Sequence, residues 1–405
     1  MSSSPTGKLT LEGVRVLDLT WVYAGPVCTQ LIADQGAEVI KLESERSMDV
    51  GRAGGPWLNG MNTSPDGGGG FTRLNRNKRA ITLNLKQPEG NELFKRLVAE
   101  SDVLVNNYTA GTLKRMGVGW DVLRDVNPRL IMCECSGMGQ TGPYAGFAAY
   151  GQTLLALAGA YELTGYPDSH PVMPAYTYAD FASPTIAAFA VTSALIWRKH
   201  SGMGQYIDLS QFEVTASLLA EAQFEYLVNG TERTRQGNAA PGTLIHNVFR
   251  CTGDDAWCTI VVRTPAEWTA LRAIIEDARL PETISLDCDI EAVEGLIERW
   301  TESQNSAAVM ETLQAAGIEA GRVQNTADIV DGDPHVQERG YFETYEHLLG
   351  ERVRVDGVPF KMSLTPAHVR KPGPTYGGDN DYVFGELLGL SAERINELRQ
   401  SGVIG

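Results

Sequence analysis

The sequence has few of the residues from which metal sites and nucleophilic triads are usually built. Its 405 residues include only six cysteines and six histidines. It has no CxxC pair and no histidine at zinc-ligand spacing from a cysteine, so we expect no metal site. It also has no GxSxG nucleophile elbow, which argues against a serine hydrolase of that type. The cysteines expected to be reduced structural thiols are Cys28, Cys133, Cys135, Cys251, Cys258 and Cys288.

Positive charge is also scarce. The chain has 34 Lys and Arg against 50 Asp and Glu, a net charge of −16, which argues against a general nucleic-acid or anionic-membrane surface. No uninterrupted apolar run reaches 18 residues, and the opening MSSSPTGKLT lacks the apolar stretch of a signal peptide. We therefore expect a cytoplasmic protein without nucleic-acid or membrane partners, in which an anionic ligand binds at a local basic patch.

The first part of the chain alternates between strand and helix patterns. β-Branched runs and helical spacing recur in turn, which predicts a doubly wound parallel sheet of Rossmann-like type. The expected strands are 13–20, 38–43, 79–85, 102–108 and 129–136, and the expected helices are 26–37, 88–100 and 109–126.

The pattern changes near residue 230. Before it, helices at 184–199 and 211–229 flank a strand at 204–210. After it, a hairpin at 248–262 and three helices up to residue 316 indicate a small α+β domain. We predict a discontinuous large domain formed by 1–230 and 326–405, with the small domain at 231–325.

Two basic segments could bind an anion. Residues 71–85 contain Arg73, Arg76, Lys78 and Arg79, and residues 105–117 add Lys114 and Arg115. Guanidinium and ammonium groups make charge-assisted bonds to phosphate oxygens, so these segments suit a phosphorylated cofactor, although a solvated charged loop is the alternative. The GxGxxG match at 137–142 is weak evidence for a dinucleotide, because it follows a late strand and the first turn, TWVYAGP, lacks that pattern.

Asp180 interrupts an otherwise small and aliphatic stretch, AYTYADFASPTIAAFAVTSAL at 175–195. Ser183 is a suitable N-cap and Pro184 a suitable first helical residue, which would leave Asp180 in the turn before the helix. A carboxylate there is either a turn residue or a nucleophile that attacks an activated acyl group. Tyr176, Tyr178 and Phe181 either line an acyl pocket or pack in the core.

The order of several segments resembles CoA-transferase family III, the group that includes formyl-CoA and carnitine CoA-transferases. LEGVRVLDLTWVYAGPVCTQLIADQGAEVIKLE is similar to the family's opening βαβ unit, NRNKRAITLNLK and VNNYTAGTLKRMG to its CoA-binding segments, and SGMGQTGPY to its glycine loop. The stretch around Asp180 is similar to the segment that carries the catalytic aspartate, and SGMGQYIDLSQFEV, the segment at 313–342 and FGELLGLS follow in order.

The resemblance implies a CoA-transferase that moves CoA from an acyl-CoA donor such as succinyl-CoA to a carboxylic acid of the carnitine or benzylsuccinate type. Asp180 would be the nucleophile, passing through an acyl-aspartyl anhydride and an aspartyl-CoA thioester, with no tightly bound cofactor. The residues predicted to bind CoA are Val22, Tyr23, Ala24, Arg46, Arg76, Lys78, Arg79, Leu83, Asn107, Tyr108, Thr112, Arg115, Gly137 and Gln140.

The family further implies an interlocked dimer, formed by two copies or by two related subunits. Three positions depart from relatives: Pro184 replaces a common glycine, and Ser44 and Ser136 replace cations, of which Arg46 could substitute for one.

Two alternative functions remain. An acyl-CoA racemase would need an acid/base pair, and residues 137–152 contain no histidine; a silent partner subunit would bind CoA without transferring it.

Overall fold

The computed structural model describes residues 8–45, 47–57, 64–285, 288–347, 350 and 352–405. The chain divides into two compact units. The large unit combines residues up to 160 with 174–229 and 338–405, and the small unit combines 161–173 with 230–337. The observed boundary after Asn229 lies beside the expected one, whereas the chain rejoins the large unit at Glu338, twelve residues after the expected position.

Two segments were expected in the large domain but belong to the small unit. Residues 161–173 are attached to it by an ion pair between Glu162 and Arg235 (2.7 Å) and by a backbone hydrogen bond from Gly237 to Gly165 (2.9 Å). Residues 326–337 are attached through the ion pair of Arg322 with Asp328 (2.8 Å). The contacts of residues 161–173 join positions far apart in the sequence and leave no local pattern, which explains the first difference.

The large unit is built on a six-stranded parallel sheet with the order β3-β2-β1-β4-β5-β6. This is the order of the Rossmann fold, in which the chain winds outward in both directions from a central pair, here β1 and β4. The mixed α/β architecture with a parallel sheet is therefore as predicted. The strands are β1 (Arg15–Leu19), β2 (Glu38–Glu43), β3 (Lys78–Thr82), β4 (Val103–Asn106), β5 (Ile131–Ser136) and β6 (Gln205–Ser210).

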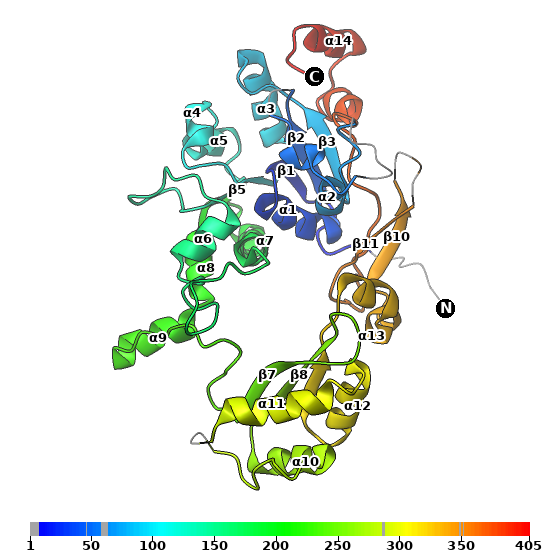
Figure 1. The fold of residues 1–405 in the computed structure, drawn as a ribbon. Helices are drawn as coiled ribbons and strands as arrows, with labels where there is room; N and C mark the ends of the chain where they lie inside the picture. Colours follow the sequence, from blue (N-terminus) through cyan, green and yellow to red (C-terminus); the bar gives the residue numbers. More distant parts are fainter. Residues whose placement is uncertain (1–7, 46, 58–63, 286–287, 348–349, 351) are drawn as a thin grey trace. The chain divides into compact units, whose positions relative to one another are not determined.

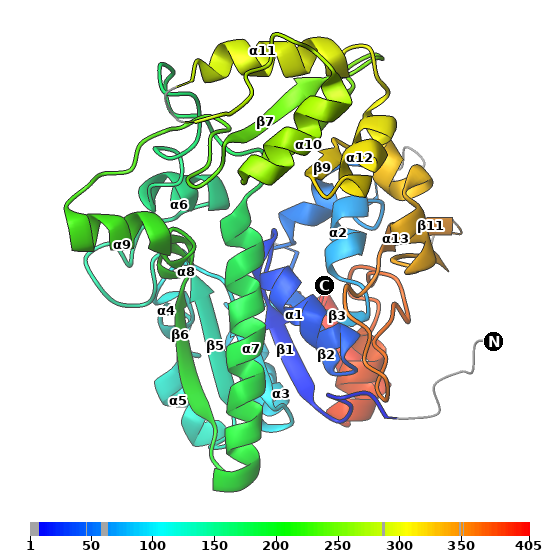
Figure 2. The same ribbon diagram turned by 90° about the horizontal axis from the view of Figure 1, so that it is seen from below.

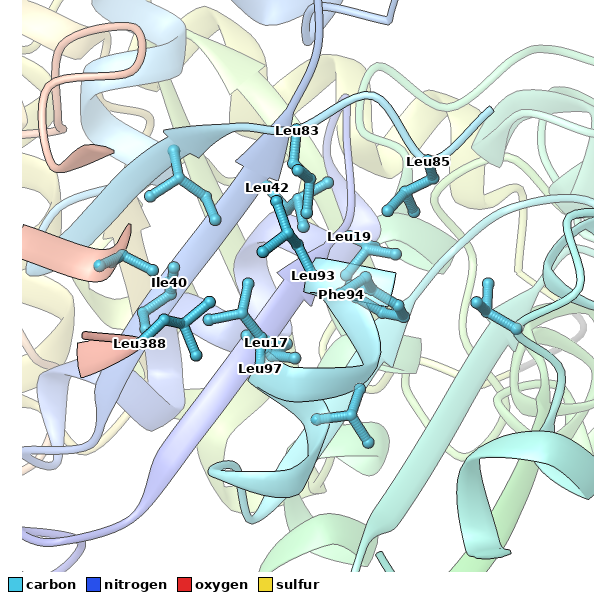
Figure 3. Packing of buried hydrophobic residues seen from close by; sticks show 14 of the residues in the cluster. Leu17, Leu19, Ile40, Leu42, Leu83, Leu85, Leu93, Phe94, Leu97 and Leu388 are labelled. Carbon is cyan, nitrogen blue, oxygen red and sulfur yellow. The ribbon is translucent and has the colours of Figure 1, made fainter. Parts of the chain in front are cut away.

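Helices cover both faces of this sheet, because its strands are apolar on both sides (Figure 1). On one face, α1 (Ala24–Asp34) and α7 (Tyr178–Ser201) pack against β4 and β5 through Ile32, Val191 and their neighbours. On the other, α3 (Pro88–Ala99) packs Leu93, Phe94 and Leu97 against leucines of β1 and β2 (Figure 3). Burying each such side chain contributes about 1.5–3 kcal/mol.

The C-terminal segment returns to the second face of the sheet. A π-helical turn, η4 (Asp381–Leu387), and α14 (Ala392–Gln400) bury Phe384 and Leu398 in the same core cluster as α3. Leu388 lies in this cluster beside Leu17 and Ile40 (Figure 3). The remaining elements of the large unit are η1 (Val50–Ala53), α2 (Gly69–Leu74), α4 (Thr112–Arg115), α5 (Trp120–Val126), α6 (Gly151–Leu157), α8 (Gln211–Ser217), α9 (Ala220–Asn229), β10 (Phe342–Glu346) and β11 (Arg352–Asp356).

The small unit has its own antiparallel sheet, in the order β7-β8-β9, and its own core around Trp268, Leu271 and Ile297. The expected hairpin is present, and a short third strand that the sequence pattern did not reveal pairs with it. Its elements are β7 (Ile245–Arg250), β8 (Trp257–Val262), α10 (Pro265–Ile275), α11 (Ile290–Thr301), α12 (Ser306–Ala315), β9 (Glu319–Arg322), the π-helical turn η3 (Asp328–Gly332) and α13 (Pro334–Glu338).

The long helix α7 begins earlier than expected. It starts at Tyr178, so Ser183 and Pro184 lie inside the helix and Asp180 lies in its first turn. The expected N-cap at Ser183 is therefore wrong, because the pattern of a cap followed by proline fits a helix start but does not require one. Figure 2 shows α7 running along the sheet. Its length and hydropathy would also allow it to span a membrane, but it packs on α1, β5 and β6.

Candidate active site

A cavity of about 460 Å³ opens at the edge of the large sheet where the parallel strands end. Its walls come from the segments that follow β1, β4 and β5, together with the first turns of α7 and α8. β1 and β4 are neighbours in the sheet, yet the chain leaves them toward opposite edges. This is the topological switch point, where open α/β sheets characteristically bind their ligands.

Asp180 lines this cavity from the first turn of α7. Its backbone N–H donates to the Thr177 carbonyl at 2.8 Å, which fixes the start of the helix. Burial raises the pKa of the Asp180 carboxyl, and a hydrogen bond from the Thr177 side chain opposes this only in part. Among the described residues, no Lys, Arg or His forms an ion pair with it. The cavity therefore presents a partly dehydrated carboxylate without a neutralising cation.

Gly151, at the start of α6, makes room for this carboxylate. A Cβ atom at position 151 would lie 2.4 Å from Asp180 Oδ2 and 2.9 Å from Thr177 Cβ. Neither separation is possible without moving the backbone or the carboxylate. The missing side chain of Gly151 therefore sets where the Asp180 carboxylate lies.

Aromatic rings surround the nucleophile candidate. The ring centroid of Phe181 lies 6.3 Å from that of Tyr23 and 6.4 Å from that of Tyr176, distances typical of aromatic pairs. Tyr176 and Tyr178 are exposed, so the core-packing interpretation of these two residues is wrong. Of the three rings in these pairs, Tyr23 lines the cavity, whereas Phe181 and Tyr176 are not among the described residues that line it.

Comparison with known proteins agrees with this geometry. Residues 11–380 match the family model of CoA-transferase family III. The chain belongs to CoA-transferase family III. It is 33% identical to the succinyl-CoA–D-citramalate CoA-transferase of Chloroflexus aurantiacus, over 97% of this chain and 98% of that protein. It is 34% identical to the β subunit of the succinyl-CoA–L-malate CoA-transferase of the same organism, over 98% and 99%.

A solved structure supports the same assignment. A CAIB/BAIF family protein from Brucella suis superposes with a TM-score of 0.85 at 30% identity, covering 94% of this chain and all of that one. The resemblance inferred from the order of motifs is thus confirmed, and the chain is an enzyme of family III. The two named relatives are succinyl-CoA-dependent CoA-transferases, which supports CoA transfer as the activity class of this chain.

Half of the residues predicted to bind CoA line the cavity of this family III enzyme. Asn107 also fixes the opposite wall, since its side chain accepts from Trp21 N (3.0 Å) and donates to Trp21 O (2.9 Å). Burial raises the pKa of Tyr108 to about 12, so its hydroxyl stays protonated. The seven lining residues from the prediction are Val22, Tyr23, Ala24, Asn107, Tyr108, Thr112 and Gly137.

Four more predicted residues lie around the cavity or outside the described chain. Gln140 accepts from Gly111 N at 2.9 Å, and the exposed guanidinium of Arg115 donates to the hydroxyl of Thr112 at 2.9 Å, next to the cavity wall. Leu83 is buried and lines a smaller cavity of about 40 Å³ that shares Tyr108 with the larger one. Arg46 lies outside the described residues.

The other three predicted contacts are corrected by the structure. Arg76 donates to Asp34 (2.8 Å) and Lys78 to Asp18 (3.0 Å), both in the interior. Arg79 is bound by two carboxylates, those of Glu38 (3.1 Å) and Asp379 (2.8 Å). These cations serve the fold, because each already has an anionic partner and a phosphate would have to displace it. Arg73, in the preceding helix α2, likewise pairs with Asp356 at 2.6 Å.

Lys86 is the cation that the sequence reasoning missed. It is exposed and lines both the large and the small cavity, and it is the sole Lys or Arg among the described residues that line either one. It follows β3 at the carboxyl edge of the sheet, whereas Lys78 and Arg79 open the same strand at the other edge. Position relative to the strand end, rather than local density of charge, was the signal that could have identified Lys86.

Proposed function

We propose that this family III enzyme transfers CoA from succinyl-CoA to a small carboxylic acid, with Asp180 as the nucleophile. The observation that carries the proposal is the Asp180 carboxylate, which lines the cavity at the switch point, has a raised pKa and forms no ion pair with any cation in the described part of the chain. A carboxylate that is poorly solvated and not neutralised by a cation is better able to attack an activated acyl carbon.

The proposed reaction is balanced without any other reagent. A carboxylate oxygen of Asp180 attacks the thioester carbonyl carbon, the C–S bond breaks, and CoA leaves as the thiolate with an acyl-aspartyl anhydride behind. The thiolate then attacks the aspartyl carbonyl carbon, which releases the donor acid and forms an aspartyl-CoA thioester. The acceptor carboxylate attacks that thioester, and the two steps run in reverse to give the new acyl-CoA.

The chain's own residues have separate roles in this proposal. Lys86 lines the cavity and Arg115 lies beside its wall, and both would bind the phosphates of CoA, because each can donate charge-assisted hydrogen bonds to phosphate oxygens. Val22, Tyr23 and Ala24 face the reacting end beside Asp180. The glycine at 151 keeps the carboxylate in the cavity.

We infer a small dicarboxylic or hydroxy-dicarboxylic acceptor from the named relatives, which act on citramalate and malate. The carnitine or benzylsuccinate type expected earlier has less support, since neither is named among those two relatives. The racemase alternative lacks support as well, because no histidine is among the described residues that line the cavity.

We propose further that the chain works as a dimer, with a second copy or with a related subunit. One relative is the β subunit of an enzyme that also has an α subunit, which supports the second arrangement. The outer face of α7 carries a stripe of exposed apolar residues at helical spacing, and α9 buries none of its residues. The stripe consists of Ile186, Phe189, Ile196 and Trp197.

The direct test is to trap the intermediate. Wild-type protein mixed with succinyl-CoA and no acceptor should form an aspartyl-CoA thioester and release succinate. Hydroxylamine should convert this thioester to a hydroxamate, and borohydride should reduce it, each leaving a mass change on the peptide that contains Asp180. A label found on another residue, or no label while citramalate or malate still receives CoA, would refute Asp180 as the nucleophile.

The dimer is tested by sedimentation. Sedimentation as a 44 kDa monomer at micromolar concentration would refute it.

A further inference from the structure

Val22 has a backbone conformation that a valine strongly disfavours. Its φ is +67°, in the left-handed region, and it lies in the wall of the cavity between β1 and α1. For a β-branched residue this conformation brings Cβ close to the following backbone and is rarely seen. Such strain persists only where the surrounding structure imposes it, and it concentrates at functional sites.

A buried ion pair contacts the backbone on either side of this segment. The Val22 N–H donates to Asp49 Oδ1 at 3.0 Å, and the same oxygen accepts from Gly51 N at 2.9 Å. The other carboxylate oxygen of Asp49 lies 2.9 Å from Lys41 Nζ, with both side chains almost fully buried. Lys41 Nζ also donates to the Thr20 carbonyl at 2.6 Å. The pair therefore holds the chain on both sides of Trp21.

The charge of Lys41 is secured by its neighbours. Burial alone would lower the pKa of Lys41, but the carboxylates of Asp49, Asp18 and Glu43 outweigh it, and the pKa is raised. The ammonium group thus stays protonated and keeps both of its contacts. Asp49 itself is held in place by a bond from its own N–H to Glu43 Oε1 at 3.0 Å.

The segment that this pair holds faces the nucleophile. Tyr23 follows Val22, and its ring lies against Phe181, the residue after Asp180, with the centroids 6.3 Å apart. We propose that the Lys41–Asp49 pair is a positioning device, which holds Val22 in the left-handed conformation so that Tyr23 and Ala24 face Asp180 across the cavity. The inference rests on the proposed function only in taking this cavity as the acyl-CoA site.

Two double variants test the proposal with their charges matched. Lys41→Met with Asp49→Asn keeps an oxygen that accepts from Val22, and Lys41→Met with Asp49→Leu has a similar shape but no acceptor. Loss of the acceptor should raise the KM for succinyl-CoA and the Kd for CoA about tenfold or more in the Leu variant relative to the Asn variant. The Asn variant leaves a buried amide N–H unpaired, so it should not be the more stable of the two. A difference in stability alone would therefore not give the Asn variant the higher affinity for CoA. Equal constants in two folded variants would overturn the proposal.

Val22→Gly provides the rescue. Glycine adopts φ of +67° without strain, so Val22→Gly should improve CoA affinity in the Leu variant at least about threefold more than in the Asn variant, whatever the loss of the valine side chain from the cavity wall does in both. The same effect in both backgrounds would overturn the proposal. If wild-type protein transfers no CoA, the proposed function fails, and the inference is then judged by unfolding: Val22→Gly should raise the Tm more in the Leu variant than in the Asn variant.

Discussion

Asp18, which is fully buried, and Asp180, which is partly buried, are two carboxylates whose pKa values move in opposite directions. Burial would raise the pKa of Asp18, but Lys78 and Lys41 outweigh burial and lower it. Asp180 has no such cation among the described residues, so burial raises its pKa. The Asp18 carboxylate is paired with buried lysines and stabilises the fold, whereas the Asp180 carboxylate remains available to react with a ligand. The neighbouring cations, rather than burial alone, separate a structural charge from a reactive one.

The largest expected effect is the loss of transfer in Asp180→Asn. This substitution keeps the shape of the side chain but removes the nucleophile, so transfer from succinyl-CoA should fall at least about a thousandfold. Affinity for CoA should stay within about threefold, because the proposed phosphate contacts are elsewhere. A continuous thioester-exchange assay and CoA calorimetry measure the two quantities. Retention of more than a tenth of the activity would place Asp180 with Asp18 among the structural carboxylates.

The second largest effect should be a loss of stability when Lys78, the partner of the structural carboxylate Asp18, is replaced. Lys78→Met leaves the Asp18 charge buried with one cation fewer, and breaking such a pair costs about 3–5 kcal/mol of unfolding free energy. Lys86→Met is the matched control: it removes an exposed lysine and should change the unfolding free energy by less than about 0.5 kcal/mol. Urea unfolding followed by circular dichroism compares the two. Equal midpoints would mean that Lys78 is not essential to the buried network.

The sequence predicted the fold more completely than the site, and these two lysines show why. Apolar periodicity and turn residues act locally, so the alternation of strands and helices and the parallel sheet were readable. The partner of a charge is set by tertiary contacts: Lys78 lies 60 positions from Asp18. The one local difference between the two lysines is that Lys78 opens β3 and Lys86 follows its end, and the density of charge around Lys78 obscured it. The start of α7 was misplaced for a similar reason, because Ser183 and Pro184 have the local features of a helix start.

Gly151→Ala should show how narrowly the reactive carboxylate is placed. The added Cβ meets Asp180 Oδ2 at 2.4 Å, so the carboxylate or α6 has to move. Displacement of a reacting group by about 1 Å can cost about a hundredfold in rate, and we expect a loss of that order in kcat with a smaller change in KM. Gly146→Ala is the control, since a Cβ there meets nothing within 4 Å. Similar kcat values for the two variants would show that the position of the Asp180 carboxylate tolerates the added methyl group.

Lys86→Met should have a moderate effect that depends on salt. If the ammonium meets a phosphate of CoA, its loss should raise the KM for succinyl-CoA about tenfold at low ionic strength and less at high ionic strength, because salt screens an exposed contact. Arg79→Met is the matched comparison, since Arg79 is bound by Glu38 and Asp379 and should leave KM unchanged. A larger effect at Arg79 than at Lys86 would instead support the segment with Arg76, Lys78 and Arg79 as the phosphate site.

The smallest effect should appear in the stability of Asp180→Asn. The folded-state pKa of Asp180 lies above its ordinary value near 3.8, so the protonated acid is the form that the fold favours. Its stabilising effect is complete below the unfolded pKa and is lost as pH rises through the folded pKa. At pH 7 the wild-type chain therefore carries a partly dehydrated carboxylate that the Asn variant lacks, and the variant should be slightly more stable, with the gap closing as pH falls toward 4. Measuring the difference between the two chains at each pH cancels the opposite contribution of Asp18. A variant that is less stable than wild type at pH 7 would mean that Asp180 is stabilised as an anion, which would end its contrast with Asp18.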